Sequence, residues 1–232
     1  MGKNSRRLRN PHASVAEFES PAGTTRTVLT GTRFAHSRDM TRMLVLYATT
    51  DGQTARIAEA LAGAMRAQGA EVDLADAATR DPSPEGYAAV VVAASVHAGG
   101  YQRSVKRWVH AHAPALFGRR TAFVSVCLGV LQHDPQVDRE LRTIKERFLT
   151  ETGWQPSVVK VVAGALPYTK YNWVKRWVMR RIVRKAGGDT DTSRDYEYTD
   201  WEDVGRFGRD FAAKAQDTAA RVQDTRLALA GR

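Results

Sequence analysis

The sequence lacks several features that would place it in familiar classes. Its 232 residues include a single cysteine, Cys127, which excludes an internal disulfide framework and is typical of a reducing compartment. No apolar run approaches the ~20 residues that a membrane-spanning helix needs. The chain has neither the Gly-Lys-Ser/Thr of a phosphate-binding P-loop nor a Gly-x-Gly-x-x-Gly dinucleotide fingerprint. Cysteine and histidine do not recur at metal-ligand spacing, so we expect no metal site.

Positive charge is unevenly distributed along the chain. The net charge is +10, yet residues 43–166 carry 13 basic and 12 acidic side chains and are nearly neutral. Residues 1–42 have a net charge of +5, and residues 167–186 carry 7 basic and no acidic side chains. Charge this local suits an anionic membrane surface or an acidic small molecule as well as a nucleic acid.

Residues 1–42 are rich in Arg, Ser, Thr and Gly and show no sustained period, so we expect a disordered extension. Alternatively, the native chain starts at Met40 or Met43, just before the first apolar segment. The segment lacks the continuous apolar core of a secretory signal, although its Arg-rich, acid-poor composition is similar to that of a transit peptide.

From Met43 onward, apolar strand patterns alternate with helical patterns. We expect strands at 43–48, 70–76, 87–95, 120–128 and 157–166, and helices at about 54–68, 103–113, 135–152, 171–186 and 199–216. This alternation predicts an α/β domain over 43–216, followed by a helical or frayed tail at 217–232. Its five-stranded parallel sheet should be doubly wound, with order 2-1-3-4-5 and helices on both faces, and such sheets bind ligands at the carboxyl ends of their strands.

The first strand-to-helix connection, residues 49–54, is rich in hydroxyls and has no bulky or basic side chain. Free N–H groups and the positive dipole end of the next helix point into such a connection. The pattern indicates a cradle for a phosphate monoester, and the alternative is an ordinary polar turn with Thr54 as the helix N-cap. The expected phosphate-binding residues are Thr49, Thr50, Asp51, Gly52, Gln53 and Thr54.

The spacing around this loop carries a family resemblance. Its key positions are Val45, Leu46, Tyr47, Thr49, Gly52, Thr54, Ala58 and Leu61. They resemble the flavodoxin fingerprint, which implies FMN rather than FAD as cofactor. Loops at 94–104 and 125–135 should then flank the flavin ring. The expected ring-contacting residues are Ser95, Val96, His97, Gly99, Tyr101, Ser125, Val126, Cys127 and Leu128.

Three of these side chains also have plainer interpretations. Tyr101 could stack on the ring or pack within the core. Cys127 could face the ring or simply be a small buried residue. His97 could contact flavin or substrate, or remain a solvated loop histidine.

The segment 163–212 carries more distinctive motifs. They are Gly-Ala-Leu at 164–166, a Tyr-, Trp- and Arg-rich stretch at 171–184, Gly-Gly-Asp-Thr-Asp-Thr at 187–192 and Tyr-Thr-Asp-Trp-Glu at 198–202. Residues 51–54 and 123–128 fit the same family pattern. Over 43–216 the chain resembles the flavodoxin-like, menaquinone-dependent protoporphyrinogen oxidases (protoporphyrinogen IX dehydrogenases) of bacteria. The resemblance implies oxidation of protoporphyrinogen IX to protoporphyrin IX in haem biosynthesis, with electrons passing through FMN to menaquinone or another membrane quinone. Flavin N5 would accept the hydride from a CH–CH donor, so no side chain is assigned a catalytic role.

The basic segment 171–186 is expected to be a helix near the membrane. Its candidates for binding substrate propionates or lipid headgroups are Lys175, Arg176, Arg180 and Arg181. Trp173 and Trp177 suit a membrane interface, while the alternative is a helix packed on the sheet, with Arg stems covering the surface. The resemblance implies a cytoplasmic protein held peripherally on the inner face of the cell membrane, without a nucleic-acid partner, and it leaves a homo-oligomer open.

Two loops depart from the family's pattern. His97 and Ala98 stand where an Arg-Tyr pair is common, and residues 129–138, often rich in Lys and Arg, have no basic residue except His133. Both loops lie where substrate would dock, so the cofactor follows from the sequence more directly than the substrate. The alternatives are an NAD(P)H-dependent quinone reductase, an electron-carrier flavodoxin (usually acidic, unlike segment 167–186) and a basic binding module without flavin.

Overall fold

The computed structural model describes residues 41–132, 134–166 and 193–230, which all belong to one compact unit. The predicted extension, apart from its last two residues, and the predicted basic helix at 171–186 lie outside the described residues. In chain order the elements are β1 (Arg42–Ala48), α1 (Gln53–Ala67), β2 (Glu71–Asp76), β3 (Ala89–Ser95), α2 (Arg103–Leu116), β4 (Arg120–Val126), the short 3-10 helix η1 (Gly129–Leu131), α3 (Pro135–Thr152), β5 (Val158–Val162), β6 (Ala165–Leu166), β7 (Tyr196–Glu197) and α5 (Trp201–Ala230).

Five parallel strands form the main sheet, in the order β2-β1-β3-β4-β5, which confirms the predicted topology. Every residue of β3 is buried, because helices cover both faces of this central strand. The register sets Ala48 beside Ala94, and Ser95 beside Val126. The ends of β1, β3 and β4 therefore meet at one edge of the sheet, and the connections that follow them gather there.

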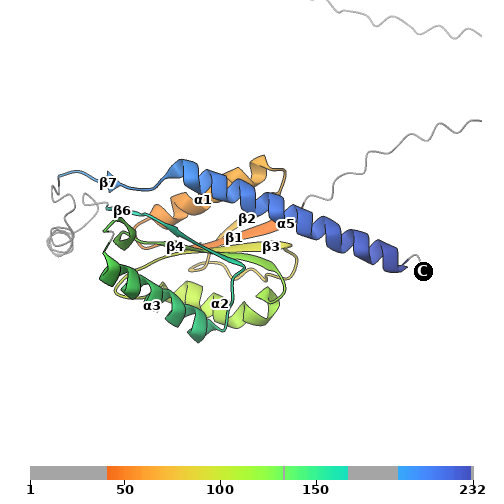
Figure 1. Cartoon of the computed structure of the whole chain (residues 1–232), viewed down its shortest axis with the longest axis horizontal. Coiled ribbons are helices and arrows are strands. Elements are labelled where there is room, and N and C mark those ends of the chain that lie inside the picture. The colour runs from red at the N-terminus through yellow and green to blue at the C-terminus, as the bar shows by residue number, and fades with distance from the viewer. Residues whose placement is uncertain (1–40, 133, 167–192, 231–232) are drawn as a thin grey trace, which may run out of the picture. The chain divides into compact units, whose positions relative to one another are not determined.

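Of the described helices, α1 and α5 cover one face of the sheet and α2 and α3 cover the other (Figure 1). Successive side chains of a strand point to opposite faces. Met43 and Val45 accordingly pack with α1 and α5, while Leu44 and Leu46 pack with α2 and α3. The two cores together fix the edge at which the loops lie.

The contact between α1 and α5 is close at one glycine. A Cβ atom placed on Gly208 would lie 3.0 Å from Cβ of Ala64 and 3.1 Å from the carbonyl oxygen of Leu61. Beyond this contact α5 continues to Ala230, past the predicted end at about 216, because residues 209–230 contain no Gly or Pro to stop it.

The predicted strand at 157–166 is wrong in its second half. Strand β5 ends at Val162, and β6 leaves the main sheet to pair antiparallel with β7. The chain turns away because Thr199 Oγ1 donates to the carbonyl of Ala163 at 2.8 Å and Tyr198 N donates to that of Gly164 at 3.1 Å. These partners lie more than thirty residues further along the chain, so a continuous apolar pattern could not reveal the break.

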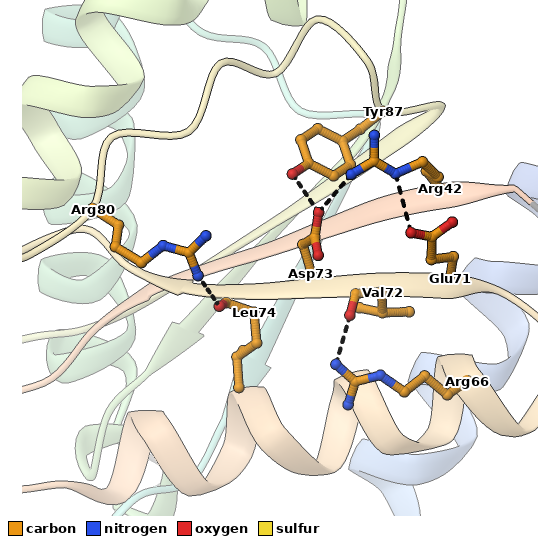
Figure 2. A network of polar contacts seen from close by, with 8 residues as sticks. All are labelled: Arg42, Arg66, Glu71, Val72, Asp73, Leu74, Arg80 and Tyr87. Atoms are coloured by element: carbon orange, nitrogen blue, oxygen red, sulfur yellow. Dashed lines mark hydrogen bonds and ion pairs between the residues drawn. The ribbon is translucent and has the colours of Figure 1, made fainter.

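A polar network holds the edge strand β2 against β1 (Figure 2). The guanidinium of Arg42 lies 3.4 Å from Glu71 Oε1 and 2.9 Å from Asp73 Oδ2, and the Tyr87 hydroxyl donates to the same Asp73 oxygen at 2.6 Å. These donors lower the pKa of Asp73, with the Tyr87 bond the largest cause. Arg66 and Arg80 donate to β2 carbonyls, so the network supports the sheet rather than the loop edge.

Candidate functional site

A cavity of about 280 Å³ lies at the carboxyl ends of β1, β3 and β4. Its lining combines ten residues expected from sequence with six that were not. The expected ones are Thr49, Asp51, Gln53, Thr54, Ser95, Val96, His97, Val126, Cys127 and Leu128. The others are Ala98, Gly129, Gln132, Leu141, Gly164 and Ala165. Thr50, Gly52, Gly99, Tyr101 and Ser125 lie outside this lining. The fold thus brings all three predicted loops to one site.

The connection after β1 has the geometry of an anion cradle. Gly52 is the residue before α1 and adopts φ 95°, a left-handed conformation that favours glycine. Its N–H donates to Thr49 Oγ1 at 2.9 Å, so the Thr49 hydroxyl proton remains available for a ligand. Helix α1 begins at Gln53, one residue earlier than predicted, and Thr54 is buried in its first turn, which contains no acidic residue. Helix N–H groups and the dipole therefore favour an anion here.

Gln53 has a supporting role in this loop. Its side-chain amide donates to Glu197 Oε1 at 2.9 Å and to Thr199 Oγ1 at 2.8 Å. Arg56 donates to the Gln53 amide oxygen at 3.0 Å and pairs with Glu197 at 3.1 Å. These bonds join the start of α1 to the segment around β7. The amide donors of Gln53 bond that segment and not a ligand.

Gln102 joins the first and second loops, and the sequence interpretation missed it. Its amide nitrogen donates to Thr50 Oγ1 at 3.2 Å and to Ser95 Oγ at 2.7 Å, and its amide oxygen accepts from Ser95 N at 3.2 Å. A polar residue directly before α2 was the only available signal, and it did not reveal these long-range partners. Gln102 fixes the positions of two predicted ligand-binding residues.

The turn after β3 closes on itself. The backbone N–H of His97 donates to the carbonyl of Gly100 at 2.8 Å, and the reverse bond measures 3.0 Å. Ala98 and Gly99 between them adopt left-handed conformations, with φ 46° and 75°. The amides of His97 and Gly100 are thus used within the turn, whereas His97 and Ala98 line the cavity.

The structure packs Tyr101, which is partly buried, against the core and outside the cavity lining. Its hydroxyl bonds Ser125 Oγ at 2.8 Å, and its ring packs edge-on against Phe123 and Phe148 with centroids 5.0 Å away. Burial raises the Tyr101 pKa to about 12. These contacts favour the packing interpretation, and they occupy Ser125, another expected ring contact.

Cys127 lies in the cavity lining although it is only 7% exposed. Burial raises the pKa of its thiol, against the opposing influence of the backbone amides of Val130 and Gly129. Gly129 is needed here because a Cβ atom would lie 2.9 Å from Val137 Cγ1. The third loop thus presents a neutral thiol and packs closely against α3.

The lining has a distinctive chemistry. Among the described residues it contains no Lys or Arg, and its polar groups there are hydroxyls, amides, one imidazole, one thiol and the carboxylate of Asp51. Among the residues that the structure describes, no group of three His, Cys, Asp or Glu side chains could hold a metal ion. Neutral donors beside a helix N-terminus at one end, and apolar and backbone surface at the other, suit a phosphate monoester carrying a planar ring.

The comparisons with known proteins agree with this geometry. The flavodoxin domain family model matches residues 44–193. The protoporphyrinogen IX dehydrogenase (quinone) of Escherichia coli (strain K12) is 36% identical over 172 residues, which cover 74% of this chain and 94% of that protein. The protein of the same name from Leishmania major is 34% identical over 176 residues, covering 74% and 75%.

Among solved structures, the chain is similar to the oxidised flavodoxin 1 of Bacillus cereus. The two are 16% identical, with a TM-score of 0.46, and the match covers 74% of this chain and 97% of that one. The family of this chain is shown by the flavodoxin domain model and by the sequence relatives. The chain therefore belongs to the flavodoxin-like family of quinone-dependent protoporphyrinogen IX dehydrogenases, which are oxidoreductases.

Proposed function

We propose that this protein oxidises protoporphyrinogen IX to protoporphyrin IX in haem biosynthesis, with FMN as cofactor and menaquinone or another membrane quinone as electron acceptor. The observation that carries the proposal is a cavity lined by residues of all three loops expected to hold flavin. The 36% identity to the E. coli enzyme supports the substrate and acceptor.

The residues present fit a monophosphate nucleotide. The hydroxyls of Thr49 and Thr54 and the first N–H groups of α1 would hold the phosphate, with Thr50 at the rim, supported by Gln102. Charge-assisted hydrogen bonds of this kind contribute roughly 1.5–3 kcal/mol each. The binding groups that the described part of the lining offers a phosphate are neutral donors and the helix dipole.

The second and third loops would hold the ring. FMN, when bound, supplies an isoalloxazine ring that takes up two electrons from a donor and delivers them to an acceptor. Val96, Val126 and Leu128 line this part of the cavity and would shield the bound ring from water. Cys127 stays protonated at neutral pH, since its pKa is raised, and so adds no negative charge beside the ring.

Membrane attachment is part of the proposal. The acceptor resides in a bilayer, and we assign contact with anionic lipid on the inner face of the cell membrane to Lys175, Arg176, Arg180 and Arg181. The proposal rests on their charge, which attracts such a surface. In the part of the chain that the structure describes, no helix is long and apolar enough to cross a bilayer.

An anaerobic turnover assay tests the function. FMN-loaded protein mixed with protoporphyrinogen IX and a quinone analogue should produce porphyrin fluorescence, and protein stripped of FMN should produce none. Folded, FMN-loaded protein without turnover would reject the assignment. Bleaching of the flavin by NAD(P)H alone would indicate a quinone reductase, and a protein that stays colourless after FMN addition would indicate a binding module.

A further inference from the structure

A groove of about 370 Å³ lies between the 97–100 turn and the exposed side of α3. Arg147 of α3 donates to the carbonyl oxygen of Gly99 and so holds the turn against the helix. The groove is lined by Gly99, Gln136, Arg139, Glu140, Thr143, Ile144 and Arg147. It forms no part of the cavity described above.

Adjacent residues of the 97–100 turn and of α3 line the cavity and the groove. In the turn, Ala98 lines the cavity and its neighbour Gly99 lines the groove. In α3, Leu141 lines the cavity and its neighbour Glu140 lines the groove. A ligand that reaches the ring end of the cavity over this turn therefore has the groove directly beside it.

The groove carries an exposed cation. The guanidinium of Arg139 has no hydrogen bond or ion pair among the described residues, whereas Arg147 is engaged with the turn. Of the described residues that line the groove, Glu140 alone is acidic, and the Gln136 side chain donates to it at 3.4 Å. A planar guanidinium with open donors is suited to a carboxylate, which it can bind through two parallel bonds.

We propose that this groove is a subsite for a carboxylate of the substrate, bound by Arg139. The inference rests on the proposed function, since protoporphyrinogen IX carries two propionates at the edge of its ring system. Arg147 is a positioning residue that shapes the groove by holding the turn. The subsite would supply a basic contact for the substrate in a chain whose 97–98 and 129–138 segments contain no Lys or Arg.

Comparing protoporphyrinogen IX with its dimethyl ester distinguishes a contact with the carboxylate from a general effect of the substitution on activity. We expect Arg139→Gln to raise KM for protoporphyrinogen IX roughly 5-fold, the scale of an exposed charged hydrogen bond, and to leave KM for its dimethyl ester unchanged. Glu140→Gln should act in the opposite direction and lower KM for the diacid. Porphyrin fluorescence anisotropy in one detergent measures the affinity of FMN-loaded protein for protoporphyrin IX and for its ester. Arg139→Gln should weaken binding of the diacid and leave binding of the ester unchanged, as for KM.

Arg142→Gln is the matched control, because Arg142 is an exposed arginine of the same helix outside the groove lining. Equal KM changes in Arg139→Gln and Arg142→Gln, or equal changes for diacid and ester, would overturn the subsite. Wild-type protein that turns over neither substrate would instead reject the proposed function. If Arg139→Gln weakens binding to phosphatidylglycerol vesicles and leaves the preference for diacid over ester intact, the cation serves lipid headgroups and the proposal fails.

Discussion

Gly52 and Gly63 lie at the start and in the middle of α1 and differ in backbone conformation. Gly52 has φ 95°, which an L-residue adopts at a cost of roughly 1–2 kcal/mol, and Gly63 is an exposed helical residue. A Cβ atom would meet nothing within 4 Å at either position. Any difference between alanine substitutions at the two sites therefore reports on the backbone alone.

Gly52→Ala should lower the free energy of unfolding by about 1 kcal/mol and weaken FMN binding several-fold, because the loop must leave its left-handed conformation. Gly63→Ala should raise the free energy of unfolding by ~0.5–1 kcal/mol and leave FMN binding unchanged. Denaturant unfolding of the apoprotein and flavin fluorescence titration measure the two effects. The same sign of stability change in both variants would contradict the left-handed cap.

Tyr101 should make stability fall at alkaline pH. The folded-state pKa is about 12 and the ordinary value is 10.0, so between these pH values the unfolded chain releases a proton that the folded chain keeps. Stability is then lost as pH rises through this window, by up to about 2 kcal/mol. Tyr101→Phe loses the Ser125 bond, worth ~1 kcal/mol, but escapes the decline. The tyrosine protein should be the more stable of the two below pH 10 and the less stable by pH 12. Parallel stability curves would refute the burial of this phenol.

At the scale of elements, the site depends on side chains that join one loop to another. Gln102, at the start of α2, bonds both the loop after β1 and the end of β3. Gln102→Leu should weaken FMN binding roughly 10-fold, since both loops lose a shared support, with little change in melting temperature. Gln216→Leu is the control, because the Gln216 side chain donates to the Gln68 carbonyl at the far end of α1 and has no other partner in the described part of the chain. Equal affinities in the two variants would show that Gln102 does not organise the site.

The packing of α1 on α5 gives a second pair of opposite effects. Gly208→Ala should lower the free energy of unfolding by ~1–3 kcal/mol, because the new methyl group meets Ala64 and the Leu61 backbone. Gly205→Ala should raise it by ~0.5–1 kcal/mol, since its nearest neighbour is the flexible end of Arg209. Thermal unfolding measures both changes. A stabilising Gly208→Ala would mean that the two helices are not in close contact.

At the scale of the whole molecule, the location of charge should decide membrane binding. Most cosedimentation with anionic vesicles should be lost when glutamine replaces Lys175, Arg176, Arg180 and Arg181. Each cation near the surface contributes about 1 kcal/mol of binding free energy. The control carries the same net charge, with glutamine at Arg103, Arg107, Arg142 and Arg209, all exposed. Equal losses in the two proteins would show that total charge, and not the 171–186 segment, governs binding.

The strands followed from sequence because each is a local signal, and the order 2-1-3-4-5 followed from the doubly wound, flavodoxin-like form that their alternation with helices indicated. The alternation of apolar strands with helical patterns required only neighbouring residues, and so did the hydroxyl-rich turn around Thr49 and Gly52. The same holds for the three loops, since parallel strands place their carboxyl ends at one edge. The break at Ala163, by contrast, depends on Thr199, a partner distant in sequence.

The sequence by itself determined the alternating α/β pattern and the three loops, since periodicity and turn chemistry are properties of short segments, and the sheet order followed from the fold class that this pattern indicates. Tertiary structure alone decided which side chains of those loops face the cavity. It turned Tyr101 toward Phe123 and Phe148, committed Gln53 to Glu197, and made Gln102 the link between two loops. The physical reason is that a side chain's direction is chosen by contacts with partners far along the chain, and no local pattern encodes them.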